Sequence, residues 1–360
     1  MEKAKQQKEA QEKPELRSFT LAATGDFLTH EAVLSSALEQ GGGKYEFTQM
    51  LAPIKDIISA ADFAVCHQEV PMSATNENIT AYPVFNAPKE MAKAIAAIGY
   101  DACSTASNHS LDQGSEGIAE TLKLFERQGL RTEGTNRTPR EDGRATLVPI
   151  NGVIVGWLSY TYGLNGFVGE DHEVNVIDTN EILQRAKDAK RRGAEFVFLS
   201  VHWGLEFQTT PTEQQTTLAR RLLRSPAVDL IIGHHVHVPQ PIERIGKEYV
   251  FFGLGNILSN QRAGVTATCC PTESQDGIIA QVEVKERPNG SFVTKASYTP
   301  TWVEPGSYRV LPVARYMSDP QTPADTRAAL SESWKRTVAT INSMGAARKG
   351  VRPSEKPKAA

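Results

Sequence analysis

The stretch Asp229–Glu243 reads DLIIGHHVHVPQPIE and carries His234, His235 and His237 within four positions. These histidines follow the apolar run 230–232, which is typical of a buried strand. Imidazoles at the end of a core strand are either metal ligands or hydrogen-bonded core side chains. The rest of the sequence has to decide between these two interpretations.

Composition and charge indicate an ordinary globular protein. The length of 360 residues is enough for one large domain or two ordinary ones. Of these residues 40% are hydrophobic and 22% are charged, which allows a sizeable core. The net charge of −3 argues against a broad nucleic-acid surface, so we predict no nucleic-acid partner. The apolar runs are too short to cross a bilayer, and no signal peptide is visible.

The chain has four cysteines and no C-x-x-C pair, which argues against a structural zinc knuckle. Cys66 and Cys103 lie in strand-like runs, where we expect buried thiols rather than a disulfide. The adjacent Cys269 and Cys270 lie in an expected loop, and their state is left open between redox activity and bonds elsewhere.

Apolar runs of strand type alternate with helical patterns along the chain, which predicts an α/β fold with a largely buried sheet. Strands are expected at 18–25, 62–67, 100–107, 153–160, 195–201 and 228–233, and helices at 53–61, 88–99, 116–129, 179–193 and 211–225. Thr179 is the expected N-cap of its helix. The last third adds antiparallel strands at 249–256, 277–286 and 291–300. We divide the chain into a polar, disordered linker (1–17), one domain (18–315), and a C-terminal helix with a mobile tail (316–360).

Polar residues follow five of the expected strands, at the point where each strand ends. They are Asp26, the run His67-Gln68-Glu69, the pair Asn108-His109, His202, and the histidine triplet. Ligands of open α/β sheets bind outside the carboxyl ends of the strands, and a wound sheet brings those ends together. Carboxylate, amide and imidazole groups suit manganese, iron or zinc. The set exceeds the needs of one ion and fits two divalent ions bridged by a carboxylate, roughly 3.5–4 Å apart.

Each residue also has a structural interpretation. Asp26 could form a turn or a helix cap, Glu69 could lie on a surface loop, and Asn108 tolerates a left-handed turn. Asp112 could cap the next helix, and His202 could be a hydrogen-bonded core residue. The joint pattern at five strand ends favours the metal site. The sequence has no G-x-S-x-G, P-loop or dinucleotide-binding motif that would support another enzyme class.

The ordered segments TGDFLTH, HQEVP, SNHSLDQGSEGIAETLKLFERQGL, SVHWGLEF, TTPTEQQTTLARRLL, LIIGHHVHVPQPIERI and FFGLGNILSNQ resemble the CapA family of bacterial capsule-synthesis proteins. The resemblance covers residues 19–261. It implies membership of the calcineurin-like metallophosphatase superfamily, with a four-layer αββα sandwich. It also implies a link to poly-γ-glutamate synthesis.

The resemblance implies a role for each matching residue. Metal ligands would be Asp26 for the first ion, Glu69 as the bridge, Asn108 and His202 for the second ion, and His235 and His237 divided between the two. His109 would be the acid or the substrate-polarising group near the leaving oxygen, and Asp112 would orient it. His67-Gln68 replaces the family's Asn-Leu, Val236 replaces a proline in the histidine cluster, and the superfamily's Asp-x-His opening is absent. His30, His67 and His234 therefore stay open as ligands.

Three functional hypotheses follow. The first is a CapA-like protein that makes, exports or anchors poly-γ-glutamate or a similar anionic polymer. The second is a metal-dependent phosphoesterase acting on a small phosphoester or nucleotide. The third is a non-catalytic, metal-stabilised subunit of a membrane polymer synthase. The polar start of the chain fits an outward-facing domain behind a membrane anchor, and it equally fits a cytoplasmic protein.

Overall fold

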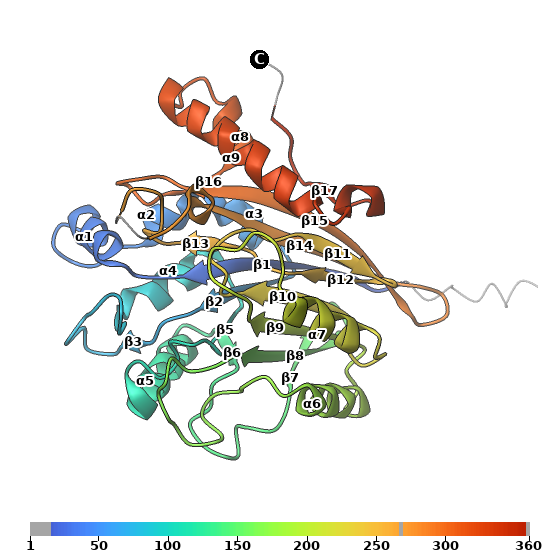
Figure 1. Cartoon of the computed structure of the whole chain (residues 1–360). Coiled ribbons are helices and arrows are strands. Elements are labelled where there is room, and N and C mark those ends of the chain that lie inside the picture. The colour runs from blue at the N-terminus through green and yellow to red at the C-terminus, as the bar shows by residue number, and fades with distance from the viewer. Residues whose placement is uncertain (1–15, 266–268, 358–360) are drawn as a thin grey trace, which may run out of the picture.

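The computed structural model describes residues 16–265 and 269–357. Two β-sheets pack face to face, and helices cover the outer face of each sheet (Figure 1). This arrangement is the four-layer αββα sandwich that the resemblance implied. Of the expected linker 1–17, only the last two residues lie within the described part of the chain.

The first sheet is built around β1 (Ser18–Phe27), which pairs in parallel with β2 (Phe63–Gln68) and antiparallel with β14 (Asp276–Glu286). The remaining strands of this sheet are β5 (Ala102–Ser104) and β6 (Arg131–Glu133) beyond β2, β15 (Phe292–Val303) and β16 (Val310–Pro312) beyond β14, β13 (Asn256–Leu258) on β1, and β17 (Arg352–Pro353) on β15.

The second sheet has a parallel centre. In spatial order its strands are β11 (Ile242–Ile245), β12 (Glu248–Phe251), β10 (Leu230–His234), β9 (Phe196–His202), β8 (Val153–Thr161) and β7 (Thr146–Ile150). β12, β10, β9 and β8 are mutually parallel, and β11 and β7 close the edges antiparallel. A separate small pair joins β3 (Met72–Ser73) to β4 (Ala87–Pro88).

Helices complete the outer layers. The first sheet is covered by α1 (Glu31–Gln40), α2 (Thr48–Leu51), η1 (Ala52–Ile54), α3 (Lys55–Ser59) and α4 (Glu90–Ile98), and the second by α6 (Thr179–Arg191) and α7 (Glu213–Leu223). The others are α5 (Gly114–Arg127), η2 (Thr272–Gln275), α8 (Val313–Ser318), α9 (Ala324–Asn342) and η3 (Ala346–Lys349). The N-cap of α6 is Asp178 and not the expected Thr179, because the Asp178 carboxylate accepts from the backbone N of Glu181 at 2.8 Å.

The layer between the two sheets is apolar. Phe19 of β1 meets Phe196 of β9 edge to face with 5.7 Å between ring centroids, and Phe63 of β2 meets Trp157 of β8 at 6.4 Å. Both faces of the central strands are buried, which explains their nearly continuous apolar sequences. This packing places the carboxyl ends of the parallel strands of both sheets at the same edge of the molecule.

Cys66 and Cys103 form a disulfide, so the expectation of two buried thiols is wrong. The two residues lie directly opposite each other in the parallel pairing of β2 and β5, with their Cα atoms 4.4 Å apart. Strand order in the sheet, which chain order alone does not give, decides this bond. Cys269 and Cys270 are bonded to each other.

β1 and the segment before β13 approach each other closely at their carboxyl ends. A Cβ atom at Gly25 would collide with the carbonyl oxygen of Gly255, so only glycine fits there. The next residue, Asp26, donates its backbone N–H to the same carbonyl at 3.1 Å. This contact fixes Asp26 at the edge where the strands end.

Candidate metal centre

Asp26 lies against the histidine loop that follows β10. Its Oδ2 accepts from the backbone N of His235 at 3.0 Å. Its Oδ1 lies 3.3 Å from Nδ1 of His234, and its Oδ2 lies 3.3 Å from Nδ1 of His237. The end of the first sheet and the end of the second therefore meet at this carboxylate.

Glu69, directly after β2, lies between histidines of the second sheet. Its Oε1 is 3.9 Å from Nε2 of His202 and 3.8 Å from Nε2 of His237. Asn108 is part of the same group, because its Oδ1 lies 2.7 Å from Nε2 of His202. The ring of His235 lies 4.7 Å from that of His202. The six residues predicted as metal ligands thus form one connected cluster.

The loop that carries the histidines has an unusual backbone. His235 and His237 have φ angles of 87° and 56°, a region that costs non-glycine residues on the order of 1–3 kcal/mol each. The surroundings hold this conformation: Phe207 donates its backbone N–H to the carbonyl of Val236 at 2.8 Å, and Nδ1 of His237 lies 3.0 Å from Oδ1 of Asn256. The fold therefore sets the direction of both imidazoles.

His109 and Asp112 form a second, adjoining arrangement. Nδ1 of His109 lies 2.7 Å from Oδ2 of Asp112, and the same oxygen accepts the backbone N–H of Phe85 at 2.7 Å. The Phe85 ring packs edge-on against His109 with 4.9 Å between centroids. Asp112 therefore holds the His109 ring in one orientation, which is the geometry its predicted role requires.

Burial favours the neutral form of two imidazoles in the cluster. Burial lowers the pKa of His202 well below its ordinary value, and burial together with His237 lowers the pKa of His235 to about 3. Burial opposes charge on His237 too, but the carboxylates of Glu69 and Asp26 raise its pKa to about 9. Neutral imidazole is the form that binds metal ions.

The two carboxylates differ in the same cluster. Burial raises the pKa of Asp26, but the adjacent imidazoles of His234 and His237 outweigh it and hold the pKa well below the ordinary value. Burial raises the pKa of Glu69 well above the ordinary value, and the charge of Asp26 adds to it. Glu69 is therefore the member of the cluster that most lacks a partner for its negative charge.

The donor set fits divalent cations. Among the described residues, buried atoms without a hydrogen-bond partner include Asp26 Oδ1, both carboxylate oxygens of Glu69 and Nδ1 of His235. A buried polar atom left in this state costs about 1–3 kcal/mol. Three overlapping groups have ligand atoms within 4.8 Å of one another: Asp26–Glu69–His237, Asp26–His67–His202 and Glu206–His235–His237. Oxygen and nitrogen donors in this mixture suit manganese, iron or zinc.

Glu206 joins the cluster although the sequence did not single it out. Its Oε1 lies 3.9 Å from Nε2 of His237, and its side chain is 47% exposed. It stands in the turn after β9 and not at a strand end, so the pattern used for the other residues passed over it. Gly204 and Phe207, on either side of it in this turn, have positive φ angles of 96° and 62°.

The three histidines left open take different places. His30 is not a member of any of the three groups within the described residues, and its Nδ1 accepts from the backbone N of Asn260 at 3.3 Å. His234 contacts Asp26, as above. His67 makes a hydrogen bond at each of its ring nitrogens.

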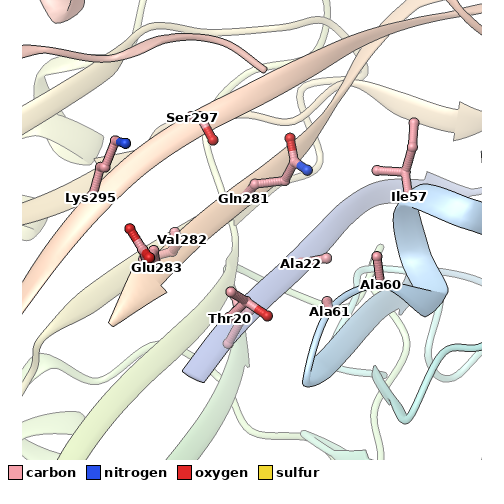
Figure 2. Close-up of a pocket in the computed structure, with 11 residues that line it drawn as sticks. Thr20, Ala22, Ile57, Ala60, Ala61, Gln281, Val282, Glu283, Lys295 and Ser297 are labelled. Atoms are coloured by element: carbon pink, nitrogen blue, oxygen red, sulfur yellow. The ribbon is translucent and has the colours of Figure 1, made fainter. Parts of the chain in front are cut away.

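A separate surface hollow of about 230 Å³ lies away from this cluster. It is formed by outward-facing residues of β1, β14 and β15 beside the end of α3, including Thr20, Gln281, Glu283, Lys295 and Ala60 (Figure 2). It contains none of the predicted site residues. The predicted site residues are therefore at the strand ends and not in this hollow.

In the described part of the chain, no helix has the length and apolar character needed to span a membrane.

The layered fold is a sandwich of the metallophosphatase type. A solved structure named "Putative 5′-Nucleotidase from Staphylococcus aureus" superposes with a TM-score of 0.51 and 13% identity, covering 88% of this chain and 58% of that one. At this identity the likeness is one of fold alone, and it supports the predicted architecture.

The chain belongs to the family described as bacterial capsule synthesis protein PGA_cap, whose sequence model matches residues 20–261. The "PGA biosynthesis protein CapA" of Bacillus subtilis (strain 168) is 29% identical over 208 residues, 57% of this chain and 52% of that protein. The "Capsule biosynthesis protein CapA" of Bacillus anthracis is 28% identical over 214 residues, 58% and 49% respectively. The matches span about half the length of these relatives, and the resemblance to the CapA family is confirmed.

Proposed function

We propose that this chain is a CapA-like, metal-dependent protein that acts in making, exporting or anchoring poly-γ-glutamate or a similar anionic surface polymer. Its family and the names of its two Bacillus relatives support this proposal. The single observation that carries the metal-dependent part is Glu69, a buried carboxylate between His202 and His237 with no hydrogen-bond partner for either oxygen among the described residues.

Two divalent ions are part of the proposal. Asp26 and His237 would hold the first ion, Asn108, His202 and His235 would hold the second, and Glu69 would bridge them. Bound there, the ions would supply Lewis-acid activation of water and of a carbonyl or phosphoryl oxygen. Manganese, iron and zinc all fit this donor set.

His109 is the proposed catalytic acid. Its Nδ1 is engaged by Asp112, which leaves Nε2 as the nitrogen that can exchange a proton with a leaving group. Tyr162 adds to the exposed side of the site, since its ring lies 4.5 Å from that of His235 and its side chain is half exposed. We propose that Tyr162 and Glu206 contact the substrate.

The proposed location is the outer face of the bacterial membrane, with membrane synthase subunits as partners. The disulfide between Cys66 and Cys103 supports it, because disulfides persist in oxidising compartments and are rare in the cytosol.

The test measures bound metal and hydrolysis together. The protein would be loaded with Mn²⁺, its metal content measured by mass spectrometry, and its activity tested on phosphodiesters, nucleotides and γ-linked glutamate oligomers. We expect His235→Ala to lose bound metal and all hydrolysis, while His172→Ala, a histidine outside the cluster, behaves as wild type. Fast turnover of one phosphoester would favour the phosphoesterase alternative, and metal-loaded but inert protein would favour the non-catalytic subunit. Unchanged metal content and activity in His235→Ala would contradict the proposed metal site.

A further inference from the structure

A continuous chain of hydrogen bonds runs beneath the metal centre. Oγ of Ser104 lies 2.8 Å from Nδ1 of His67, Nε2 of His67 lies 2.9 Å from Nδ1 of His202, and Nε2 of His202 lies 2.7 Å from Oδ1 of Asn108. All four residues are buried, so water does not compete for these bonds. The metal-facing nitrogen of His202 is thus connected to Ser104 through His67.

The chain can hold its protons in one direction with every bond made. The Ser104 hydroxyl donates to Nδ1 of His67, the Nε2–H of His67 donates to Nδ1 of His202, and the Nε2–H of His202 donates to Asn108. Asn108 presents Oδ1 to His202, and its Nδ2 donates to Oδ1 of Asn165 at 3.2 Å. In this direction His202 has no lone pair facing the cluster.

A second direction is also available, because the Ser104 hydroxyl has another acceptor in the carbonyl oxygen of Cys66 at 3.3 Å. When Ser104 donates there, Nδ1–H of His67 donates to Oγ of Ser104, and Nδ1–H of His202 donates to Nε2 of His67. Nε2 of His202 then keeps a bare lone pair. The two directions hold the same three protons and two neutral rings, and they differ only in which ring nitrogens carry hydrogen.

In the second direction two acceptors, Nε2 of His202 and Oδ1 of Asn108, face each other at 2.7 Å, with Oε1 of Glu69 at 3.9 Å from the same nitrogen. Such an arrangement is unfavourable without a positive charge and favourable with one. A cation at this point therefore selects the second direction.

We propose that His67 and Ser104 are positioning residues that set the tautomer of His202 for cation binding, and that His67 is not itself a ligand. Both nitrogens of His67 are used within the chain of hydrogen bonds in either direction. Its ring is also held in place by stacking on His234, with 4.2 Å between centroids and 14° between planes. This inference rests on the proposed metal site and assigns His67, which the family resemblance left open.

The experiment compares Ser104→Ala and His67→Phe, which break the chain, with Ser104→Thr and His67→Gln, which keep a hydroxyl or an acceptor. Ser159→Ala, a buried serine outside the chain of hydrogen bonds, is the matched control. Calorimetric titration of the metal-free proteins with Mn²⁺ measures affinity, and long-range ¹H–¹⁵N spectra with Zn²⁺ report the tautomer of His202. Melting of the metal-free proteins checks folding.

We expect the chain-breaking variants to bind one ion about 10- to 100-fold more weakly, with the conservative variants and Ser159→Ala close to wild type. His202 should carry its proton on Nε2 without metal and on Nδ1 with it. Wild-type affinity in Ser104→Ala and His67→Phe overturns the inference, as does loss of an ion in His67→Phe with no change in Ser104→Ala, since His67 is then a ligand. In both cases the proposed metal site stands. Wild-type protein that binds no divalent ion overturns the proposed function as well.

Discussion

The layer between the two sheets and the cluster at the strand ends are equally buried, yet they differ in what burial does. Burial of Phe19, Phe63 and Trp157 stabilises the folded state, because their apolar rings leave water. Trp157 also satisfies its polar atom by donating Nε1–H to Oγ of Ser200 at 3.2 Å. Glu69 is just as buried, but its carboxylate oxygens have no hydrogen-bond partner among the described residues. Burial in the apolar layer therefore stabilises the fold. Burial in the cluster costs free energy, because it holds polar atoms together without hydrogen-bond partners.

The largest effect should come from breaking the apolar layer. Trp157→Ala removes a fully buried ring that stacks on Phe198 with 5.7 Å between centroids. We expect a loss of about 3–5 kcal/mol in the free energy of unfolding, measured by urea denaturation. Val168→Ala, at a residue that is 95% exposed, should change it by no more than about 0.5 kcal/mol. A loss below about 1 kcal/mol in Trp157→Ala would show that this layer is not tightly packed.

A second buried carboxylate sharpens the comparison. Glu133 at the end of β6 accepts from Oγ1 and N of Thr146, at 2.5 and 3.2 Å, but burial still raises its pKa to about 7 from the ordinary 4.5. Because the pKa of Glu133 is higher in the folded than in the unfolded protein, its contribution to the free energy of unfolding is complete below about pH 4.5. This contribution is lost as the pH rises through about 7. We expect wild type to lose about 3 kcal/mol relative to Glu133→Gln over that interval, measured by urea denaturation at several pH values. A constant difference would contradict the raised pKa.

The same contrast explains what the sequence could predict. Asp26, Asn108, His202 and the histidine loop were predictable because each lies at or just beyond the carboxyl end of a strand, and parallel strands place such ends together. Glu206 was not, because a turn and not a strand brings it back over the site. The bond between Cys66 and Cys103 depends on which strands are neighbours, and the order of strands along the chain does not give that information.

At the C-terminal end, too, the sequence pattern predicted one element and missed another. The pattern correctly predicted a helix near α9, but Arg352–Pro353 also pairs with β15, and a two-residue strand leaves no periodic signal. The division of the chain into linker, domain and tail stays a prediction. The roles of the individual site residues also stay predictions, because geometry shows their proximity and not their chemistry.

Removing metal tests whether the unpaired cluster is completed by cations. At a Mn²⁺ concentration about 100 times the dissociation constant, we expect wild type to be stabilised by about 2.7 kcal/mol, and EDTA should reverse this. Glu69→Gln should show no such dependence, because the bridging carboxylate is lost. Thermal unfolding with and without Mn²⁺ measures both effects. An equal metal-dependent shift in the two proteins would mean that Glu69 does not contact the ions.

The smallest effect should come from the exposed carboxylate. Glu206 lies 3.9 Å from His237, but its side chain is 47% exposed. Two unit charges at about 4 Å interact by only about 1 kcal/mol in water, so solvent should reduce the contribution of Glu206 to cation affinity to tenfold or less. We expect Glu206→Gln to weaken Mn²⁺ binding within this limit by calorimetry, and Glu39→Gln, an exposed control on α1, to leave it unchanged. A loss as large as that of Glu69→Gln would place Glu206 among the direct ligands, and exposure would then no longer distinguish the two carboxylates.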